Sequence, residues 1–315
     1  MDVEQRAFAV YGGVRDAVVR MKTAGIGRAA APSDYWAEEL SNIDYMIEAS
    51  PLIIRKLRHH AFHITGIRPY DYRAQDDGRR EAFEARLKAL VELGGRDLLV
   101  PEHDALGGFG YRFADGVFNL DTIKFFEVLV GMKRGGVLAA LEKNNPVAVE
   151  IGAGWGGFAY QLKTLFPRLT YVIVDFPELF LFSATYLQTV FPGARVVYAD
   201  ATPDAAEWAG ADFVFVPHTM AERVIGITPD VTINMASFQE MTSAQVQNYA
   251  RLASDAGSPL LYSLNREVSP HNSELSSVSE QLGHYYDLRE VPVLETDYLK
   301  AMKKPSKAAD RKSVV

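Results

Sequence analysis

The stretch VEIGAGWGGF, residues 149–158, ends an apolar run and places four glycines within six positions. Val147–Ile151 has the β-branched composition of a buried strand, and Phe158–Phe166 has the apolar spacing of a helix. Glycines let a backbone turn tightly and approach a ligand where a Cβ would clash. The start of the new helix also presents unpaired N–H groups to an anion. The stretch therefore predicts a strand, a turn and a helix, with either a ligand or a tight structural turn at the glycines.

Five more short apolar runs follow with the same rhythm, and helical patterns lie between most of them. Strands that alternate with helices indicate crossover connections and a parallel sheet that is covered on both faces. We therefore predict an α/β fold whose ligand binds at the carboxyl ends of the strands, near the point where the strand order reverses. The six predicted strands are Val147–Ile151, Tyr171–Val174, Arg195–Tyr198, Phe213–Val216, Val231–Met235 and Leu260–Leu264.

The part of the chain before this pattern reads as helices. Ser33 can cap one helix, and residues 78–93 place apolar side chains at helical spacing among charged ones. We expect three parts: a helical region over residues 1–144 that covers the ligand site, a ligand-binding domain over 145–299, and a basic tail over 300–315. Chain ends fray readily, so we interpret the tail as flexible.

The composition of the 315 residues excludes several classes of protein. Hydrophobic residues make up 48% and charged residues 23%, as in soluble globular proteins. The formal net charge of −7 argues against a general nucleic-acid binder, which needs a basic surface. The absence of cysteine excludes disulfides, iron–sulfur clusters and cysteine nucleophiles. The amino terminus lacks the basic and apolar regions of a secretion signal, and no run approaches the roughly 20 apolar residues of a membrane span. We therefore expect a cytoplasmic protein without membrane contact.

Acidic residues near the glycines distinguish between two kinds of ligand. Gly152 and Gly154 begin both the G-x-G-x-x-G fingerprint of dinucleotide sites and a G-x-G-x-G pattern. Glu150 would repel a pyrophosphate, yet it suits a ligand that carries an ammonium and a sulfonium. Asp175 ends the next strand, where a carboxylate can accept both hydroxyls of a ribose. Asp200 follows the third strand and either accepts the amino group of an adenine or simply opens a turn.

These positions resemble the class I S-adenosylmethionine-dependent methyltransferases, in which E-x-G-x-G-x-G and the acid after the second strand bind the cofactor. FNLDTIKFFEVL, VEIGAGWGGFAYQL, YVIVDFPEL and INMASFQEM, all within residues 107–264, are similar to a family of sugar O-methyltransferases. The resemblance implies a Rossmann-like, doubly wound sheet of seven strands with a helical N-terminal cap region. It also implies methyl transfer from S-adenosyl-L-methionine to a hydroxyl of a sugar or glycosylated small molecule, with S-adenosyl-L-homocysteine as product. The predicted cofactor-binding residues are Glu150, Gly152, Ala153, Gly154, Asp175, Phe176, Asp200 and Ser237.

A sugar hydroxyl needs a general base or a metal ion, because its pKa lies far above neutrality. Three residues that follow strands are candidate catalytic groups. His218 comes after FVFVP and is either a base or a loop histidine beside the cofactor. Glu240 could be the base, orient a base, bind a sugar hydroxyl, or only favour the start of the next helix. His271 lies in a polar loop, where it could contact the substrate, act in catalysis, or do neither.

No metal ligand is predicted. His59 and His63 would share a helix face, but no acid nearby completes a set of about four ligands, so we interpret this segment as a surface or lid helix. Asp200, Asp204 and Glu240 could supply oxygens to Mg²⁺, although their spacing is not diagnostic. Whether the chain forms a homo-oligomer stays open.

Two other functions compete with methyl transfer. An NAD-dependent oxidoreductase of a sugar-like substrate would use the same glycines, but Glu150 and the long helical region before the glycines argue against it. A catalytically silent nucleotide-binding protein or scaffold would bind the cofactor without transferring a methyl group. Affinity for NADH without affinity for S-adenosylhomocysteine would favour the oxidoreductase.

Overall fold

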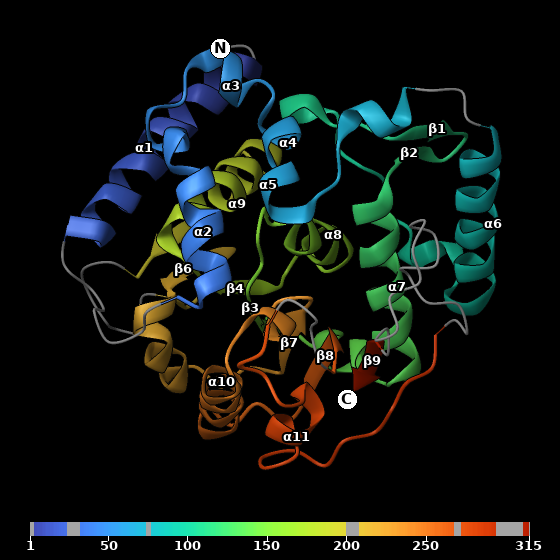
Figure 1. Cartoon of the computed structure of the whole chain (residues 1–315), viewed down its shortest axis with the longest axis vertical. Helices are drawn as coiled ribbons and strands as arrows, with labels where there is room; N and C mark the ends of the chain where they lie inside the picture. Colours follow the sequence, from blue (N-terminus) through green and yellow to red (C-terminus); the bar gives the residue numbers. More distant parts are fainter. Residues whose placement is uncertain are drawn as a thin grey trace.

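The computed structural model describes residues 3–23, 32–73, 77–199, 208–267, 272–293 and 311–314. A seven-stranded sheet in the order β5-β6-β4-β3-β7-β8-β9 forms its centre (Figure 1). Six strands are parallel and β9 is antiparallel to β8. The predicted Rossmann-like α/β fold is confirmed, and each of the six predicted runs forms a parallel strand. The strands are β3 (Val147–Ile151), β4 (Thr170–Asp175), β5 (Val196–Tyr198), β6 (Phe213–Pro217), β7 (Val231–Met235), β8 (Leu261–Arg266) and β9 (Arg311–Val314).

The strand order reverses at β3. The chain passes from β3 to β4 and then to β5 and β6 on one side, and it returns to place β7 and β8 on the other side. Ligands of doubly wound sheets bind beyond the carboxyl ends of the strands at such a switch point. The glycine-rich turn directly follows β3, so the topology puts this turn at the binding crevice.

Helices cover both faces of the sheet. One face packs against α7, α8 and α9, and the other packs against α10, α11 and the 3₁₀ segment η7. Successive residues of β3 alternate between the two cores: Ala148 belongs to the first, and Val149 and Ile151 belong to the second. This arrangement follows from right-handed crossovers that run in opposite directions on the two sides of β3. The bounds are α7 (Leu120–Arg134), α8 (Gly157–Leu165), α9 (Pro177–Val190), η7 (His218–Gly226), α10 (Ser243–Asp255) and α11 (Val278–Leu282).

The N-terminal helices extend the first layer. α1 packs along α9, and its buried Tyr11 and Val14 belong to the same core as that face of the sheet (Figure 1). Ser33 caps α2 as predicted, because its side chain accepts a hydrogen bond from the N–H of Trp36. The remaining elements are α1 (Val3–Thr23), α2 (Asp34–Asn42), η1 (Asp44–Glu48), α3 (Pro51–Ile54), α4 (Leu57–His60), α5 (Phe62–Thr65), η2 (Pro69–Tyr72), α6 (Asp77–Gly94), η3 (Arg96–Leu98), η4 (Ala105–Gly107), β1 (Tyr111–Phe113), β2 (Gly116–Phe118), η5 (Leu138–Leu141) and η8 (Phe238–Glu240).

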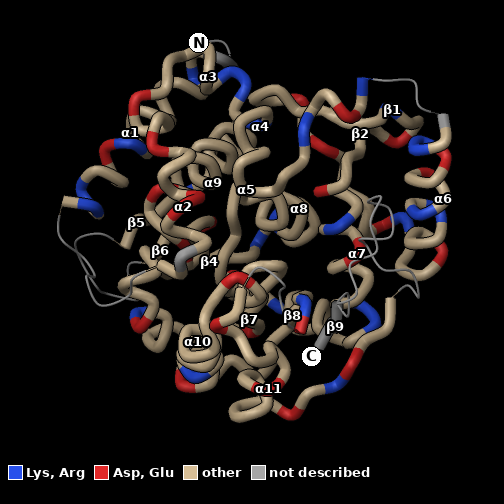
Figure 2. The backbone as a smooth tube through the Cα atoms, in the orientation of Figure 1, with Lys and Arg blue, Asp and Glu red and all other residues tan. Residues whose placement is uncertain are grey.

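Two surface features complete the fold. Acidic and basic residues are interspersed along α6, as the predicted amphipathic pattern requires (Figure 2). The tail differs from our expectation of a flexible end, because Arg311–Val314 forms β9 on β8. An edge strand leaves a row of backbone groups unpaired, and β9 satisfies those of β8 on one side. Residues 294–310 lie outside the described residues. Among the described helices, none combines the length and apolar character of a membrane span.

Candidate functional site

A cavity with about 850 Å³ of empty space lies at the carboxyl ends of β3, β4 and β7. The glycine-rich turn, Asp175 and the loop after β7 contribute one part of its lining. The N-terminal helices and Leu179 of α9 contribute the rest, so the helical region covers the site at which the sheet would hold a ligand. Polar and aromatic lining residues from these segments include Trp36, Thr65, Lys124, Ser237, Gln239 and Glu240.

The glycines of the turn are required by close packing. Gly152 and Gly154 have φ values of +75° and +58°, in the left-handed region that favours glycine. A Cβ on Gly152 would overlap the hydroxyl of Ser237, and a Cβ on Gly154 would lie 3.0 Å from a methyl group of Ile64. The turn therefore brings its bare backbone against both the loop after β7 and α5. Ala153, between the two glycines, also lines the cavity.

Asp175 ties β4 to the turn. One of its carboxylate oxygens accepts a hydrogen bond from the N–H of Gly154 at 2.9 Å, and the other accepts from the N–H of Phe176 at 2.8 Å. Burial raises the pKa of Asp175 to about 7, although these backbone hydrogen bonds favour the ionised form. The N–H of Ala153 is a third backbone donor to this carboxylate, which can accept about four hydrogen bonds in all. The residue therefore lies in the cavity with unused acceptor capacity.

Glu150 does not lie where we expected it. The sequence places it near the end of β3, and we predicted a carboxylate that faces the ligand. In the structure the side chain is fully buried and accepts a hydrogen bond from Tyr171 Oη at 2.8 Å, while Oε1 is unpartnered. Glu150 is also absent from the described residues that line the cavity. Because it precedes the last residue of β3, its side chain points from one sheet face into the interior rather than out of the strand end.

Glu240 lies in the cavity with Asp175 and Gly154. The hydroxyl of Ser33 donates a hydrogen bond to the backbone oxygen of Glu240 at 2.9 Å, so the cap of α2 holds this loop in place. Burial raises the pKa of Glu240 to about 8. The ammonium of Lys124 and hydrogen bonds from Trp36 and Gln239 favour the ionised form but do not outweigh burial. Both the protonated and the ionised form of this carboxyl group are therefore populated near neutral pH.

His218 lies in a second cavity, which has about 600 Å³ of empty space and shares Asp175 and Trp36 with the first. Its ring centroid is 4.5 Å from that of Phe176, which in turn is 5.6 Å from that of Trp36. The structure thus brings His218 beside Phe176, on a cavity that Glu240 does not line. This position matches the alternative of a loop histidine beside the cofactor better than that of a base. His271, Asp200 and Asp204 lie outside the described residues.

Ser237 has an orienting role within the loop after β7. Its hydroxyl accepts a hydrogen bond from the Asn234 amide at 2.8 Å and lies 3.3 Å from the Ile151 carbonyl oxygen. The same amide of Asn234 also donates to this carbonyl at 2.8 Å. These bonds connect the ends of β3 and β7 directly behind Gly152.

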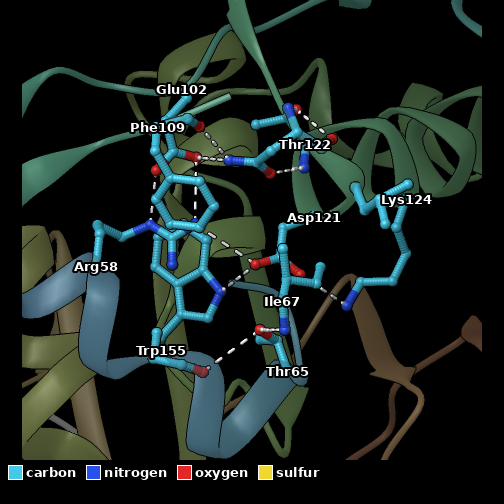
Figure 3. A network of polar contacts seen from close by, with 12 residues as sticks. Arg58, Thr65, Ile67, Glu102, Phe109, Asp121, Thr122, Lys124 and Trp155 are labelled. Atoms are coloured by element: carbon cyan, nitrogen blue, oxygen red, sulfur yellow. Dashed lines mark hydrogen bonds and ion pairs between the residues drawn. The ribbon is translucent and has the colours of Figure 1, made fainter. Parts of the chain in front are cut away.

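A buried charged network that the sequence did not predict borders the site (Figure 3). Arg58 of α4 forms ion pairs with Glu102 at 2.6 Å and with Asp121 of α7 at 3.5 Å. The same Asp121 accepts a hydrogen bond from the indole N–H of Trp155 at 3.2 Å and pairs with Lys124 at 3.3 Å. The network therefore joins two N-terminal helices to the glycine-rich turn. Its only sequence signal is NLDTIK, which the resemblance singled out without assigning a role.

The start of α8 is closed to a phosphate. Gly156 and Gly157 are buried, and a Cβ on Gly157 would overlap the rings of Trp155 and Phe125. Neither glycine is among the described lining residues of the cavity, whereas Gly152 and Gly154 are. Dinucleotide sites place the pyrophosphate at this helix N-terminus. The geometry is therefore unfavourable for the NAD-dependent alternative.

No group of three or more residues suited to hold a metal ion occurs among the described residues. The histidines of α4 and α5 contact aromatic rings. His60 Nδ1 is 2.6 Å from Tyr45 Oη, and the His63 ring lies against that of Phe62 at an interplanar angle of 34°, with centroids 3.9 Å apart. This segment continues into Ile64 and Thr65, which line the cavity.

No protein-family model and no curated protein matches this chain. Solved structures that are similar to it include an antibiotic-related methyltransferase, at 14% identity and a TM-score of 0.31 over 57% of this chain and 90% of that one. The mitomycin 7-O-methyltransferase MmcR is 17% identical, with a TM-score of 0.34 over 62% of this chain and 56% of its own. The 16S rRNA (adenine(1408)-N(1))-methyltransferase from Catenulisporales acidiphilia is 16% identical, with a TM-score of 0.33 over 57% of this chain and 90% of its own. At TM-scores below 0.5, these likenesses decide neither the fold nor the activity.

Proposed function

We propose that this protein is an S-adenosylmethionine-dependent O-methyltransferase that acts on a hydroxyl of a sugar or glycosylated small molecule. The observation that carries the proposal is the cavity in which Gly152–Gly154, Asp175 and Glu240 meet at the switch point of the sheet. The resemblance of the glycine and acid pattern to class I methyltransferases supports the same reaction.

The residues of the cavity fit the cofactor. The bare backbone of Gly152–Gly154 forms a cradle, and Asp175 has unused acceptor capacity for the hydroxyls of a ribose. Burial raises the pKa of both Asp175 and Glu240, so further positive charge placed beside them would favour their ionised forms. A ligand with an ammonium and a sulfonium would supply that charge, whereas a pyrophosphate would add repulsion. When bound, this cofactor supplies the methyl group on a sulfonium and its own leaving group.

The second cavity suits the adenine. Phe176 and His218 place two aromatic rings beside Asp175, and the amide side chains of Gln245 and Asn248 lie on the same cavity. Aromatic side chains stack on flat rings, and amides offer both donors and acceptors. This assignment makes His218 a cofactor-side residue.

The rest of the first cavity suits a polyol acceptor. Trp36 offers an aromatic face, while Thr65, Gln239 and Glu240 offer donors and acceptors around it. Polar groups of this kind orient a ligand and provide specificity in a site that is otherwise apolar. Glu240 then accepts the proton of the acceptor hydroxyl, because its carboxyl group titrates near neutral pH.

Titration calorimetry and a transfer assay test this proposal. We expect S-adenosylhomocysteine to bind and NADH not to bind, and we expect a labelled methyl group to reach at least one member of a panel of sugars and glycosides. Binding of NADH without binding of S-adenosylhomocysteine would reverse the assignment. Binding of S-adenosylhomocysteine with no transfer to any hydroxyl acceptor would favour a silent binding protein instead.

A further inference from the structure

Lys124 lies on the same cavity as Glu240, and neither the glycine pattern nor the acids predicted a role for it. It belongs to the second turn of α7, and its side chain is 13% exposed. The ammonium is the principal group that favours the ionised form of Glu240, and it also favours that of Glu150. Lys124 is therefore within electrostatic reach of both carboxyl groups.

The hydrogen bonds of this ammonium are incomplete. Within the described part of the chain, Nζ of Lys124 makes one hydrogen bond, to Asp121 Oδ1 at 3.3 Å. A lysine ammonium carries three N–H donors, so two remain for a ligand. Asp121 also receives hydrogen bonds from Arg58 and Trp155, so it does not depend on Lys124 alone (Figure 3). Asp121 thus holds Lys124 at one side of the cavity, while the other N–H donors of Lys124 stay unused.

We propose that Lys124 and Glu240 together activate the acceptor hydroxyl, which makes Lys124 a second catalytic residue of this site. The inference rests on the proposed function and deepens it. Glu240 takes the proton, and Lys124 donates hydrogen bonds to the acceptor oxygen as negative charge develops on it. Preorganised donors of this kind act strongly in a cavity that excludes water.

The transfer step balances with these two residues. The O–H bond of the acceptor breaks and its proton passes to the Glu240 carboxylate. The acceptor oxygen forms a bond to the methyl carbon, while the bond between that carbon and the sulfonium sulfur breaks. The electron pair of the broken bond stays on sulfur, which becomes a neutral thioether. Lys124 stays protonated throughout, so it stabilises charge without exchanging a proton.

Lys124→Met and Lys124→Arg separate this role from a structural one. We expect Lys124→Met to lower kcat about 100-fold or more while the affinity for S-adenosylhomocysteine stays within about threefold. The acid limb of the kcat/KM profile, which reports ionisation of Glu240, should move to higher pH because the nearby ammonium is lost. Lys124→Arg keeps a positive charge, so that limb should stay near its wild-type position.

Several groups besides Lys124 face Glu240. Arg266 of β8 favours its ionised form, and Trp36 and Gln239 hydrogen-bond to it. Tyr35 of α2 feels its charge in turn, since burial and Glu240 together raise the pKa of Tyr35. These groups are unchanged in the Lys124 variants, so a shift of the acid limb of the kcat/KM profile reports the loss of the ammonium.

Lys133→Met is the matched control. Lys133 lies on the same helix, but it bonds to the Gly94 carbonyl oxygen at 2.6 Å and lies outside the cavity. The control should therefore leave kcat and the pH profile unchanged. An unchanged kcat and pH profile in folded Lys124→Met would overturn the inference, and so would an equal effect of Lys133→Met.

A further readout separates failure of the inference from failure of the proposed function. NMR of protein with ¹³C-labelled glutamate carboxyl carbons follows the titration of Glu240 without any substrate. Absence of methyl transfer by the wild-type protein would reject the proposed function and the catalytic step with it. A higher pKa of Glu240 in Lys124→Met than in the wild-type protein would still support the pairing of the two residues. An unchanged pKa would reject the pairing even in an active enzyme.

Discussion

The guanidinium of Arg58 lies over the indole ring of Trp155, with its central carbon 3.4 Å from the ring centroid. Both side chains are buried, and Trp155 ends the part of the glycine-rich turn that lines the cavity. A cation over an aromatic face gains more when both groups are desolvated. This contact couples the shape of the turn to α4, so the N-terminal helices and the ligand-binding turn form one buried unit.

Arg58→Met is expected to destabilise the protein strongly. It leaves Glu102 and Asp121 buried without their shared cation, and removal of one partner from a buried ion pair typically costs about 3–5 kcal/mol. Urea denaturation measures the free energy of unfolding. We also expect weaker binding of S-adenosylhomocysteine by the fraction that stays folded, because Trp155 loses its support.

Arg251→Met serves as the control for that measurement. Arg251 pairs with Asp255 at 2.6 Å on the surface of α10, where both side chains are more than a third exposed. Exposed pairs of this kind contribute about 0.2–1 kcal/mol. An equal loss in the free energy of unfolding of the two variants would show that the buried network stabilises the protein no more than an exposed ion pair does.

The sequence predicted the sheet well because its strands carry a local signal. Near-continuous apolar runs such as Tyr171–Val174 are typical of strands buried on both faces, and the structure places each run in the parallel sheet. The position of Asp175 was predicted in the same way, since a residue at the end of such a run must lie at the carboxyl edge. Its contact with Gly154 follows from the topology alone.

Long-range contacts were not predictable in this way. Arg58 and Glu102 are 44 positions apart, and no pattern in either segment indicates the other. Glu150 was misplaced for a different reason: strand residues alternate between faces, and a one-residue difference decides whether a side chain leaves the sheet end or enters a core. The role of Lys124 depends on how α7 packs over the turn, which the sequence around it does not specify.

Asp175→Ala is expected to weaken the binding of S-adenosylhomocysteine by about 1–3 kcal/mol, or roughly 5- to 150-fold. The ligand hydroxyls would lose their acceptor, and the N–H groups of Gly154 and Phe176 would lose their partner. Titration calorimetry on the folded variant measures the effect.

Asp230→Ala is a matched control for this substitution. Asp230 also accepts a backbone hydrogen bond, from the N–H of Val147 at 2.9 Å, but it lies at the amino-terminal edge of the sheet. We expect it to lower stability and to leave the affinity unchanged. If Asp175→Ala binds as tightly as the wild-type protein, the ribose assignment is wrong.

Glu150→Gln should make the free energy of unfolding less dependent on pH. Burial raises the pKa of Glu150 to about 8 in the folded state, against an ordinary value of 4.5. Between these values the folded protein holds a proton that the unfolded chain has released, so the wild-type protein loses stability as pH rises through this window. Glutamine cannot ionise and keeps an acceptor for Tyr171.

Urea denaturation at pH 5 and pH 8.5 measures this difference. We expect the stability of Glu150→Gln relative to the wild-type protein to increase by up to about 4 kcal/mol between the two pH values. Asp175 and Glu240 still titrate in both proteins, so only the difference between them is informative. A constant difference would mean that Glu150 is ionised inside the folded protein.

His218→Ala and Glu240→Gln should affect different steps, because the two residues lie in different cavities. His218 packs on Phe176, so its loss should weaken binding of S-adenosylhomocysteine while kcat at saturating cofactor changes little. Loss of the base at Glu240 should lower kcat by about 10²- to 10⁴-fold with little change in that affinity. Calorimetry and initial rates at saturating cofactor separate the two effects.

The opposite result, a large loss of kcat in His218→Ala and a normal rate in Glu240→Gln, would make the histidine the base. It would also require His218 to reach the acceptor hydroxyl, although the residue lines only the second cavity in this conformation.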